Sequence, residues 1–531
     1  MIRKTKSTQS IKRKYYKEVI EPESFKKDPF KDKLRVLLIA YDSGTYMTFF
    51  PQGLAYIARV LEDDGYDVEI YNQDLHHYPV DHLTNYLNKN KFDVVGMGVI
   101  GGYWQFKMMC NISNAINKST IRPFYVIAGY GPSPEPKYFL EKTGADVCVI
   151  GEGEDTVREL IGCIADNNPW SDINGIAYFH GSNFKMNPPR ALIKDIHTIP
   201  LPAFHKFPVE IYRLRRAEHA GSRDFVMPVL SGRGCTFKCN FCYRMDMGHR
   251  KRAPESIVQE IEFLKKDYGI TYIIFNDDLL MISKEATFEI CEALIKANLN
   301  IKWWCNARLN YATPEVLSIM KRAGCVFNNY GIESFDNATL KVMKKGLTEK
   351  MIVEGVRNTY KSGISPGLNI IWGNKGETIE VLNKSVNFLL KYDDGTQMRT
   401  IRPVTPYPGS PLYFDAINMG FLDKKNPAKD FYENKHVNSD LLSVNFTNLS
   451  DDQFYDALEK ANIRLLQNYF NNKRTAYIEQ TQNLYRTKDT SFRGFRTTSS
   501  KSGGEGIVTT KRNKKLEGRN KGSMALDPDD L

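Results

Sequence analysis

Short apolar runs alternate with amphipathic stretches along the first third of the chain. The runs at 34–41 and 93–100 are almost wholly apolar, whereas 52–66 places its apolar residues at helical spacing. Strands that alternate with helices form right-handed βαβ units and a parallel sheet covered on both faces. This pattern predicts a Rossmann-like, doubly wound α/β domain. Its expected strands are 34–41, 67–72, 93–100, 123–129 and 145–154.

A second α/β series begins near residue 226 and repeats about six times. Each apolar run is followed by a stretch with helical periodicity, as in 254–269 after the first run. Six βα repeats are the length expected of a partial, TIM-like (β/α)6 barrel, whose chemistry lies at the strand carboxyl ends. Its further strands are expected at 271–278, 301–309, 325–334, 365–373 and 397–410.

The segments between and beyond the two series differ in composition. Residues 187–208 are rich in proline and predict a linker, and 451–485 have the pattern of an amphipathic helix. Both ends of the chain are basic, and we expect them to be disordered arms. The expected division is a basic arm at 1–33, a first domain at 34–180, a linker at 181–225, a barrel at 226–415, a helical C-terminal region at 416–485 and a basic tail at 486–531.

Composition limits where the protein works and what it binds. The chain of 531 residues is 42% hydrophobic and contains nine cysteines, an odd number without paired spacing, which favours a reducing cytoplasm. No apolar run reaches the length of a membrane span. The net charge is +11, and basic ends can bind polyanions. We interpret these ends as solvated arms, and nucleic-acid binding is the weaker alternative.

Three cysteines lie close together in the run RGCTFKCNFCYR. Cys235, Cys239 and Cys242 have the spacing CxxxCxxC, and soft thiolates suit iron–sulfur clusters and zinc alike. Three ligands leave one iron of a [4Fe–4S] cluster open to a small molecule, because full protein ligation takes four cysteines. Half a zinc ribbon or a redox CxxC pair would leave Cys235 and the glycine before it unexplained. The other barrel cysteines are isolated in sequence.

This loop, at the first strand of a partial barrel, resembles the signature of the radical S-adenosylmethionine (SAM) superfamily. That signature is CxxxCxΦC with an aromatic Φ, which is Phe241 here. The resemblance implies that Cys235, Cys239 and Cys242 hold a catalytic [4Fe–4S] cluster. It also implies that SAM chelates the open iron and is cleaved to methionine and a 5′-deoxyadenosyl radical.

Later segments match the same family in order. The sequence NDD stands where the family usually has GGE, and KGET resembles its GxPGET turn, with Lys375 in place of proline. PYPGSPLY resembles the closing strand PxPGT. The resemblance implies a set of SAM-binding residues at successive strand ends. They are Phe241, Asp277, Asp278, Arg308, Glu333, Ser334 and Gly373.

The first domain resembles the cobalamin-binding half of cobalamin-dependent radical SAM enzymes. Glycines follow three successive strands, and a GxGxxG fingerprint after the first strand is missing, so NAD is not expected. The DxHxxG motif that supplies an axial histidine elsewhere is also missing, and we interpret Asp74 and His76 as surface residues. Tyr103 and Trp104 could face the corrin or pack. The expected cobalamin-binding residues are Gly53, Gly98, Gly129, Gly131, Gly151, Glu152 and Gly153.

The resemblance implies a C-methyltransferase that uses the SAM-derived radical and methylcobalamin to methylate an unactivated carbon. A cobalamin-dependent oxidoreductase or cyclase without methyl transfer shares the same scaffold and stays open. An RNA-modifying enzyme is a second alternative, and a binding module with structural cysteines is a third. We expect a small-molecule or peptide substrate and an electron donor such as flavodoxin or ferredoxin.

Overall fold

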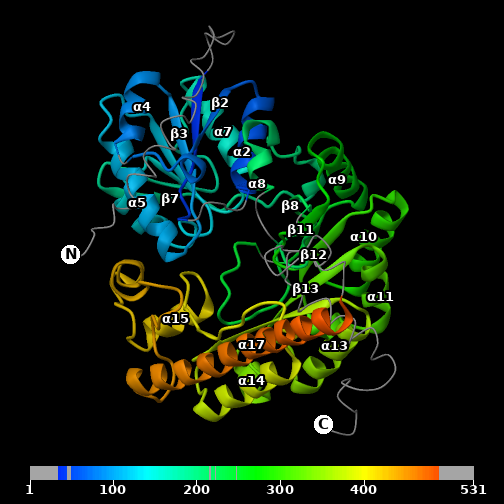
Figure 1. The fold of residues 1–531 in the computed structure, drawn as a ribbon. Coiled ribbons are helices and arrows are strands. Elements are labelled where there is room, and N and C mark those ends of the chain that lie inside the picture. The colour runs from blue at the N-terminus through cyan, green and yellow to red at the C-terminus, as the bar shows by residue number, and fades with distance from the viewer. Residues whose placement is uncertain are drawn as a thin grey trace, which may run out of the picture.

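The computed structural model describes residues 34–44, 50–79, 81–213, 217–221, 223–246 and 248–488. The predicted disorder of the N-terminal arm, and of the basic tail after residue 488, lies outside these ranges. Figure 1 shows two α/β domains side by side, with α15 near the first domain and α17 along the second. No helix in the described part of the chain is long and apolar enough to cross a membrane.

The first domain is built on a seven-stranded sheet of order β2-β1-β3-β4-β5-β6-β7. The pairs among β1 to β5 are parallel, and β6 and β7 add an antiparallel hairpin at one edge. The hairpin was not expected, and it extends the sheet into the predicted linker. The strands are β1 Arg35–Ala40, β2 Asp67–Asn72, β3 Val94–Gly98, β4 Phe124–Ala128, β5 Val147–Val149, β6 Ile176–His180 and β7 Asn183–Met186.

Helices cover both faces of this sheet, which confirms the doubly wound fold. One face packs against α4, α5 and α6, and the other packs against α2 and α7. Each helix buries one apolar stripe, as expected for helices that alternate with strands. The helices are α2 Gln52–Asp63, α3 Gln73–His76, α4 His82–Asn90, α5 Tyr103–Asn117, α6 Pro136–Thr143 and α7 Glu154–Ala165.

The second sheet has the order β15-β14-β13-β12-β11-β8, and its neighbouring strands are all parallel, as predicted for a partial barrel. The strand expected at 397–410 is wrong for most of its length. Only Arg402–Pro403 pairs with β14, because prolines at 403, 406 and 408 cannot donate to a ladder. The strands are β8 Val226–Val229, β11 Tyr272–Phe275, β12 Lys302–Ala307, β13 Cys325–Glu333, β14 Ser365–Trp372 and β15 Arg402–Pro403.

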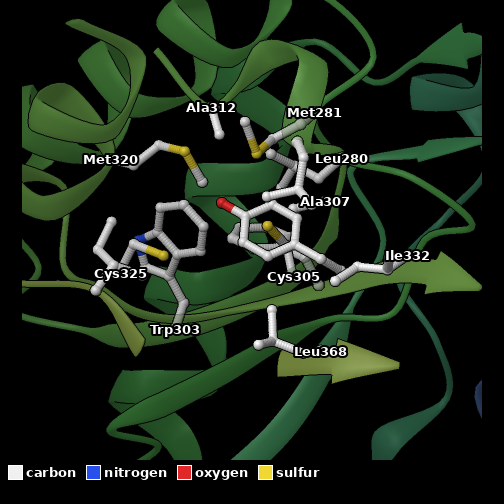
Figure 2. Close-up of a cluster of buried hydrophobic side chains, with 14 of the residues drawn as sticks. Leu280, Met281, Trp303, Cys305, Ala307, Ala312, Met320, Cys325, Ile332 and Leu368 are labelled. Carbon is white, nitrogen blue, oxygen red and sulfur yellow. The ribbon is translucent and has the colours of Figure 1, made fainter. Parts of the chain in front are cut away.

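Helices pack on the convex face of the barrel. Their core, drawn in Figure 2, gathers the thiols of Cys305 and Cys325 with methionine, leucine and tryptophan side chains. Burial raises the pKa of both thiols well above the ordinary value, so they are core residues and not candidate ligands. The barrel helices are α9 Pro254–Tyr268, α10 Lys284–Ala297, α11 Pro314–Arg322, α12 Asn337–Val342, α13 Glu349–Lys361 and α14 Ile379–Tyr392.

Short elements join and complete these layers. The linker segment contains η2 Ile196–Thr198, η3 Phe204–Lys206 and α8 Val209–Tyr212, and η4 Leu309–Tyr311 follows β12. The two-residue strands β9 Gly232–Arg233 and β10 Arg250–Lys251 pair antiparallel. Because they bracket residues 234–249, they close the base of the cysteine loop.

The C-terminal region touches both domains. The segment from α15 Pro411–Asn418 through α16 Pro427–Lys429 and the π-helical turn η5 Asp430–Lys435 packs on the core of the first domain. The long helix α17 Asp451–Thr487 runs beside α14 (Figure 1). A capping box of Ser450 and Gln453 starts it, and Phe454 stacks on Trp372 with ring centroids 4.3 Å apart. The region therefore contacts both domains, α15 to η5 the first and α17 the barrel.

Candidate functional site

The three signature cysteines lie in one loop over the carboxyl ends of the barrel strands, where the sequence predicts them. Cys239 is buried, Cys235 is half-buried and Cys242 is exposed. The thiols of Cys239 and Cys242 share a hydrogen bond, which lowers the pKa of Cys239 although burial acts against it. Charges from Lys345 and Arg308 lower this pKa further. The loop therefore offers a thiolate in a cationic setting.

The donor set suits a cluster better than a single ion. Among the described residues, no group of three His, Cys, Asp or Glu side chains converges closely enough to hold one metal ion. The ligands of a cluster bind different iron atoms, so Cys235, Cys239 and Cys242 need not converge on one point.

Asp277 fixes the start of the cysteine loop. Its carboxylate accepts hydrogen bonds from the backbone N–H groups of Ser231 (2.7 Å) and Gly232 (3.1 Å), and from the Ser231 hydroxyl. The side chain is buried, and burial raises its pKa to about 7. Its oxygens face the protein, whereas the neighbouring Asp278 is exposed and forms no hydrogen bond within the described structure.

Asn240 ties the middle of the loop to two distant segments. Its side-chain amide exchanges hydrogen bonds with that of Asn374, at 3.3 and 3.2 Å. Its backbone N–H donates to Met343, and its carbonyl accepts from Leu412. Asn374 is fully buried. The loop is therefore held from three sides, and this amide pair was not expected from the sequence.

Cationic and aromatic side chains surround the cysteines. The Arg308 guanidinium lies 3.4 Å from the ring centroid of Phe237, and burial lowers its pKa. Lys345, which the sequence did not single out, forms a 2.9 Å ion pair with Glu333 and lies 5.7 Å from the ring of Phe241. These cations can balance thiolate charge in a half-buried site.

The last strand ends form a buried hydrogen-bonded unit. The Ser334 hydroxyl donates to Glu377 (3.1 Å), and the backbone N–H groups of Gly373 and Asn374 donate to the same carboxylate, both at 2.9 Å. Glu333 beside it has φ 69°, a conformation that non-glycine residues adopt mainly where tertiary structure imposes it. Glu377 therefore holds the turn that resembles GxPGET.

The predicted cobalamin residues lie at the carboxyl ends of the strands of the first sheet, which we call the glycine-rich edge. Several of them have open space in front of them. A Cβ on Gly53, Gly98 or Gly151 would meet no atom within 4 Å. At Gly129 (φ 109°) a Cβ would come within 2.5 Å of the Val99 carbonyl oxygen, so this tight crossing requires glycine. Gly131 packs against Gly101.

Large apolar side chains are exposed along the same edge. Ile100, Trp104 and Tyr130 are 60, 42 and 43% exposed, in the loops after β3 and β4 or at the start of α5. Exposed apolar side chains beside open glycines suit a large macrocycle with apolar faces, so the residues present fit cobalamin. Tyr103, by contrast, packs edge-on against His436.

Two of the predicted cobalamin residues serve the protein itself. Gly153 is the N-cap residue of α7, and a Cβ there would crowd Ile57 of α2 at 3.1 Å. Glu152 accepts hydrogen bonds from Arg233 and Arg250 at 2.7 and 2.9 Å. Its contact with cobalamin stays a prediction; in the structure its oxygens accept from arginines distant in sequence.

Asp74 and His76 are half-buried and not surface residues as expected. The Asp74 carboxylate accepts hydrogen bonds from the backbone N–H and the hydroxyl of Ser43, both at 2.9 Å. It pins the start of the loop after β1. The pKa of His76 is lowered by burial and then by two neighbouring histidines. These contacts join Asp74 to Ser43 and place His76 near other histidines, and none of them involves the glycine-rich edge.

The glycine-rich edge and the cysteine loop face each other. Tyr130 contacts Tyr243 with ring centroids 6.0 Å apart, and Gly409 is closely approached by Tyr243 and Pro134. A cavity of about 240 Å³ lies between the loop after β5 and the residues after Cys242. It is lined by Ile150, Gly151, Glu152, Asp155, Pro189, Arg190, Ala191, Leu192, Ile193, Tyr243 and Met245.

Two family models match the chain in this order. The B12 binding domain matches residues 45–161, and the Radical SAM superfamily matches residues 229–389.

The chain is similar over most of its length to relatives named as methyltransferases and to relatives named as cyclases. An uncharacterized methyltransferase of Pyrococcus horikoshii is 28% identical over 71% of this chain and 81% of its own length. An anaerobic magnesium-protoporphyrin IX monomethyl ester cyclase of Rubrivivax gelatinosus is 26% identical over 68% of this chain and 65% of its own. The solved structure of TsrM, a radical SAM methyltransferase from Kitasatospora setae with cobalamin and a [4Fe–4S] cluster, superposes with a TM-score of 0.58. It is 18% identical and covers 73% of this chain and 75% of its own, so the likeness is one of fold.

Proposed function

A chain in which a B12-binding domain precedes a radical SAM domain belongs to the cobalamin-dependent radical SAM enzymes, and on that premise we propose that this one is a C-methyltransferase. The observation that carries the proposal is the meeting of the apolar, glycine-rich edge with the cysteine loop, at Tyr130 and Tyr243. A methyl donor held at the first surface and a radical source held at the second would flank one reaction space. The relative from Pyrococcus horikoshii bears a methyltransferase name.

We assign the cluster to Cys235, Cys239 and Cys242. When bound, the cluster would supply the electron that cleaves SAM, and cobalamin would supply the methyl group. The chain's own task at this site is to hold three thiolates and to leave room for SAM. Lys345 and Arg308 lower the pKa of Cys239, which favours the thiolate needed for iron binding.

The SAM-facing surface is proposed to include Phe241, Asp278, Arg308 and Glu333. Asp278 is exposed and has unused acceptors, so it can receive the SAM ammonium. We give Asp277 a positioning role, because its oxygens already hold Ser231 and Gly232.

Ser334 and Gly373 are proposed to shape the floor of the same surface through Glu377. Both bond that carboxylate, and Ser334 is fully buried. The backbone around them, and not the Ser334 hydroxyl, is then what SAM would meet.

We propose Gly53, Gly98, Gly129, Gly131 and Gly151 as the cobalamin-facing glycines. Three of them lack neighbours that a side chain would meet, and two, Gly129 and Gly151, have a positive φ. The exposed apolar side chains after β3 and β4 would cover a corrin face and exclude water from the reaction space. This proposal retains the limits 34–180 and 226–415 for the two domains, with β7 added to the first.

The runner-up is a cobalamin-dependent cyclase or oxidoreductase that transfers no methyl group. The cyclase name of the Rubrivivax gelatinosus relative favours it, and the scaffold would be the same. In either case we propose a small-molecule or peptide substrate and an electron donor of the flavodoxin or ferredoxin type. The nine free thiols suit a reducing cytoplasm.

Labelled SAM separates the two reactions. The reconstituted enzyme would be incubated anaerobically with a reductant, a small-molecule extract of its host and SAM carrying a trideuterated methyl group. We expect a product whose mass rises by one labelled methyl group and which depends on added cobalamin. A cobalamin-dependent product without the label would reject methyl transfer and favour the runner-up.

A further inference from the structure

Five charged side chains form a network of ion pairs where the two domains meet. Glu152 is its centre: its carboxylate accepts hydrogen bonds from Arg233 at 2.7 Å, from Arg250 at 2.9 Å and from the backbone N–H of Ile193 at 2.9 Å. Arg233 also pairs with Glu154, and Arg250 with Asp246. We call these five residues (Glu152, Glu154, Arg233, Asp246, Arg250) the interdomain ion-pair network.

The interdomain ion-pair network is largely shielded from water. The arginine side chains are 16% exposed and the three carboxylates 8 or 9% exposed. Burial alone would raise the pKa of Glu152, but hydrogen bonds from Arg233 and Ile193 and the two arginine charges outweigh it and lower the pKa. Glu152 is therefore ionised, and a buried ion pair of this kind is costly to break from one side.

The interdomain ion-pair network joins the loop after β5 to the base of the cysteine loop, and these two segments border the candidate functional site. Glu152 stands between Gly151 and Gly153, directly after β5, at the glycine-rich edge. Arg233 lies two residues before Cys235, and Arg250 lies on the strand that closes the cysteine loop. The cavity of about 240 Å³ lies beside Glu152 and is lined also by residues 189–193, Tyr243 and Met245. Arg233 and Arg250 lie opposite each other on β9 and β10, so the contact to Glu152 starts from the paired base of the cysteine loop.

We propose that Arg233, Arg250 and Glu152 are positioning residues that hold the corrin-binding edge at a fixed separation from the cluster loop. This inference rests on the proposed function, since it needs both cofactors in one chain. A misplacement of about 1 Å can cost roughly 100-fold in rate, so a bridge between the two segments has a direct use. Neither sheet depends on the bridge for its own hydrogen bonds, so the two segments can separate while both domains stay folded.

Two variants cut the bridge in different ways. Arg233→Met removes the guanidinium that spans Glu152 and Glu154. Glu152→Gln keeps the shape but removes the charge, and it retains a single acceptor oxygen for two arginines. Arg158→Met is the matched control, because Arg158 pairs with Asp64 between α7 and α2 within one domain.

The test is the separation of the two cofactors, read by pulsed EPR in the reconstituted full chain that holds the reduced cluster and cob(II)alamin. We expect one narrow distribution of cluster–cobalt distances in the wild type and in Arg158→Met, and a broader or longer one in both bridge variants. In the protein without cofactors, hydrogen exchange should rise at 150–153 and 232–246 in the bridge variants and not in the control.

The outcomes separate this inference from the proposed function. A distribution in Arg233→Met and Glu152→Gln that matches the wild type, at equal cofactor loading, overturns the inference and leaves the proposed function intact. A wild-type chain that retains no cobalamin overturns both. If Arg233→Met does not fold, Glu152→Gln carries the same comparison, because a neutral isostere leaves the packing unchanged.

Discussion

Glu377 gives the structure a pH dependence that can be measured without any cofactor. Its carboxyl is buried, and burial raises the pKa from its ordinary value of 4.5 to about 7 although three hydrogen bonds act against the shift. The folded protein therefore keeps a proton on Glu377 that the unfolded chain releases near pH 4.5. Stability from this group is fully present below the unfolded pKa and is lost as the pH rises through the folded pKa.

The size of the effect follows from the two pKa values. A rise from 4.5 to about 7 corresponds to about 3 kcal/mol over the whole titration, at about 1.36 kcal/mol per pKa unit. Between about pH 5.5 and about pH 8 the wild type should lose about 2 kcal/mol through this group. In Glu377→Gln the amide oxygen can accept from Gly373 and Asn374, and the amide nitrogen can donate to the Ser334 hydroxyl. The variant should therefore fold and lose this part of the pH dependence.

Urea unfolding of the cofactor-free full chain at the two pH values gives the comparison. The difference between wild type and Glu377→Gln isolates this carboxyl from all others, and Glu380→Gln, on the exposed surface of α14, is the control. The control should keep the wild-type slope. Equal pH dependence in the wild type and Glu377→Gln would show that the carboxyl is ionised in the fold and that its pKa is not raised.

Three further predictions concern the cluster, the cobalamin edge and α17. Cys235→Ala should abolish iron–sulfur absorbance and SAM cleavage, whereas Cys305→Ala, in the core of Figure 2, should keep both; a Cys235→Ala chain that cleaves SAM contradicts the ligand assignment. Gly98→Val should leave the melting temperature unchanged, since a Cβ there meets no atom within 4 Å, and should raise the Kd for cobalamin at least ~10-fold by filling space proposed for the corrin; unchanged affinity speaks against that placement. Phe454→Ala should cost about 3–5 kcal/mol of unfolding free energy by urea titration, whereas Phe470→Ala, 58% exposed, should stay within about 0.5 kcal/mol; equal losses would mean that the stacking on the barrel is not what anchors the helix.

Much of the fold could be predicted because its signals are local. The strands of both sheets are short apolar runs, and the cysteine spacing lies within eight residues, 235–242. The strand at 397–410 was overestimated because an apolar pattern does not reveal which backbone groups can bond, and prolines interrupt this one. The β6–β7 hairpin was missed because Asn183–Met186 is only four residues long, is mostly exposed and lies at an edge of the sheet.

The site contacts that the sequence does not predict depend on partners distant in sequence. Glu152 stands in a glycine loop, and the arginines that bond its carboxylate lie 81 and 98 residues away. Asn240 and Asn374, separated by 134 residues, form their amide pair only in the fold. No periodicity or spacing encodes such pairs, since tertiary packing alone brings them together.

We propose that one chain joins a SAM-cleaving cluster to a cobalamin site. The absorption spectrum and the 5′-deoxyadenosine yield of the anaerobically reconstituted protein, with and without added cobalamin, test this. We expect broad iron–sulfur absorbance, reductant-dependent 5′-deoxyadenosine, and cobalamin that stays bound through gel filtration. Cobalamin that washes away, or SAM that stays intact in the presence of a filled cluster and a reductant, would contradict the joining of the two cofactors.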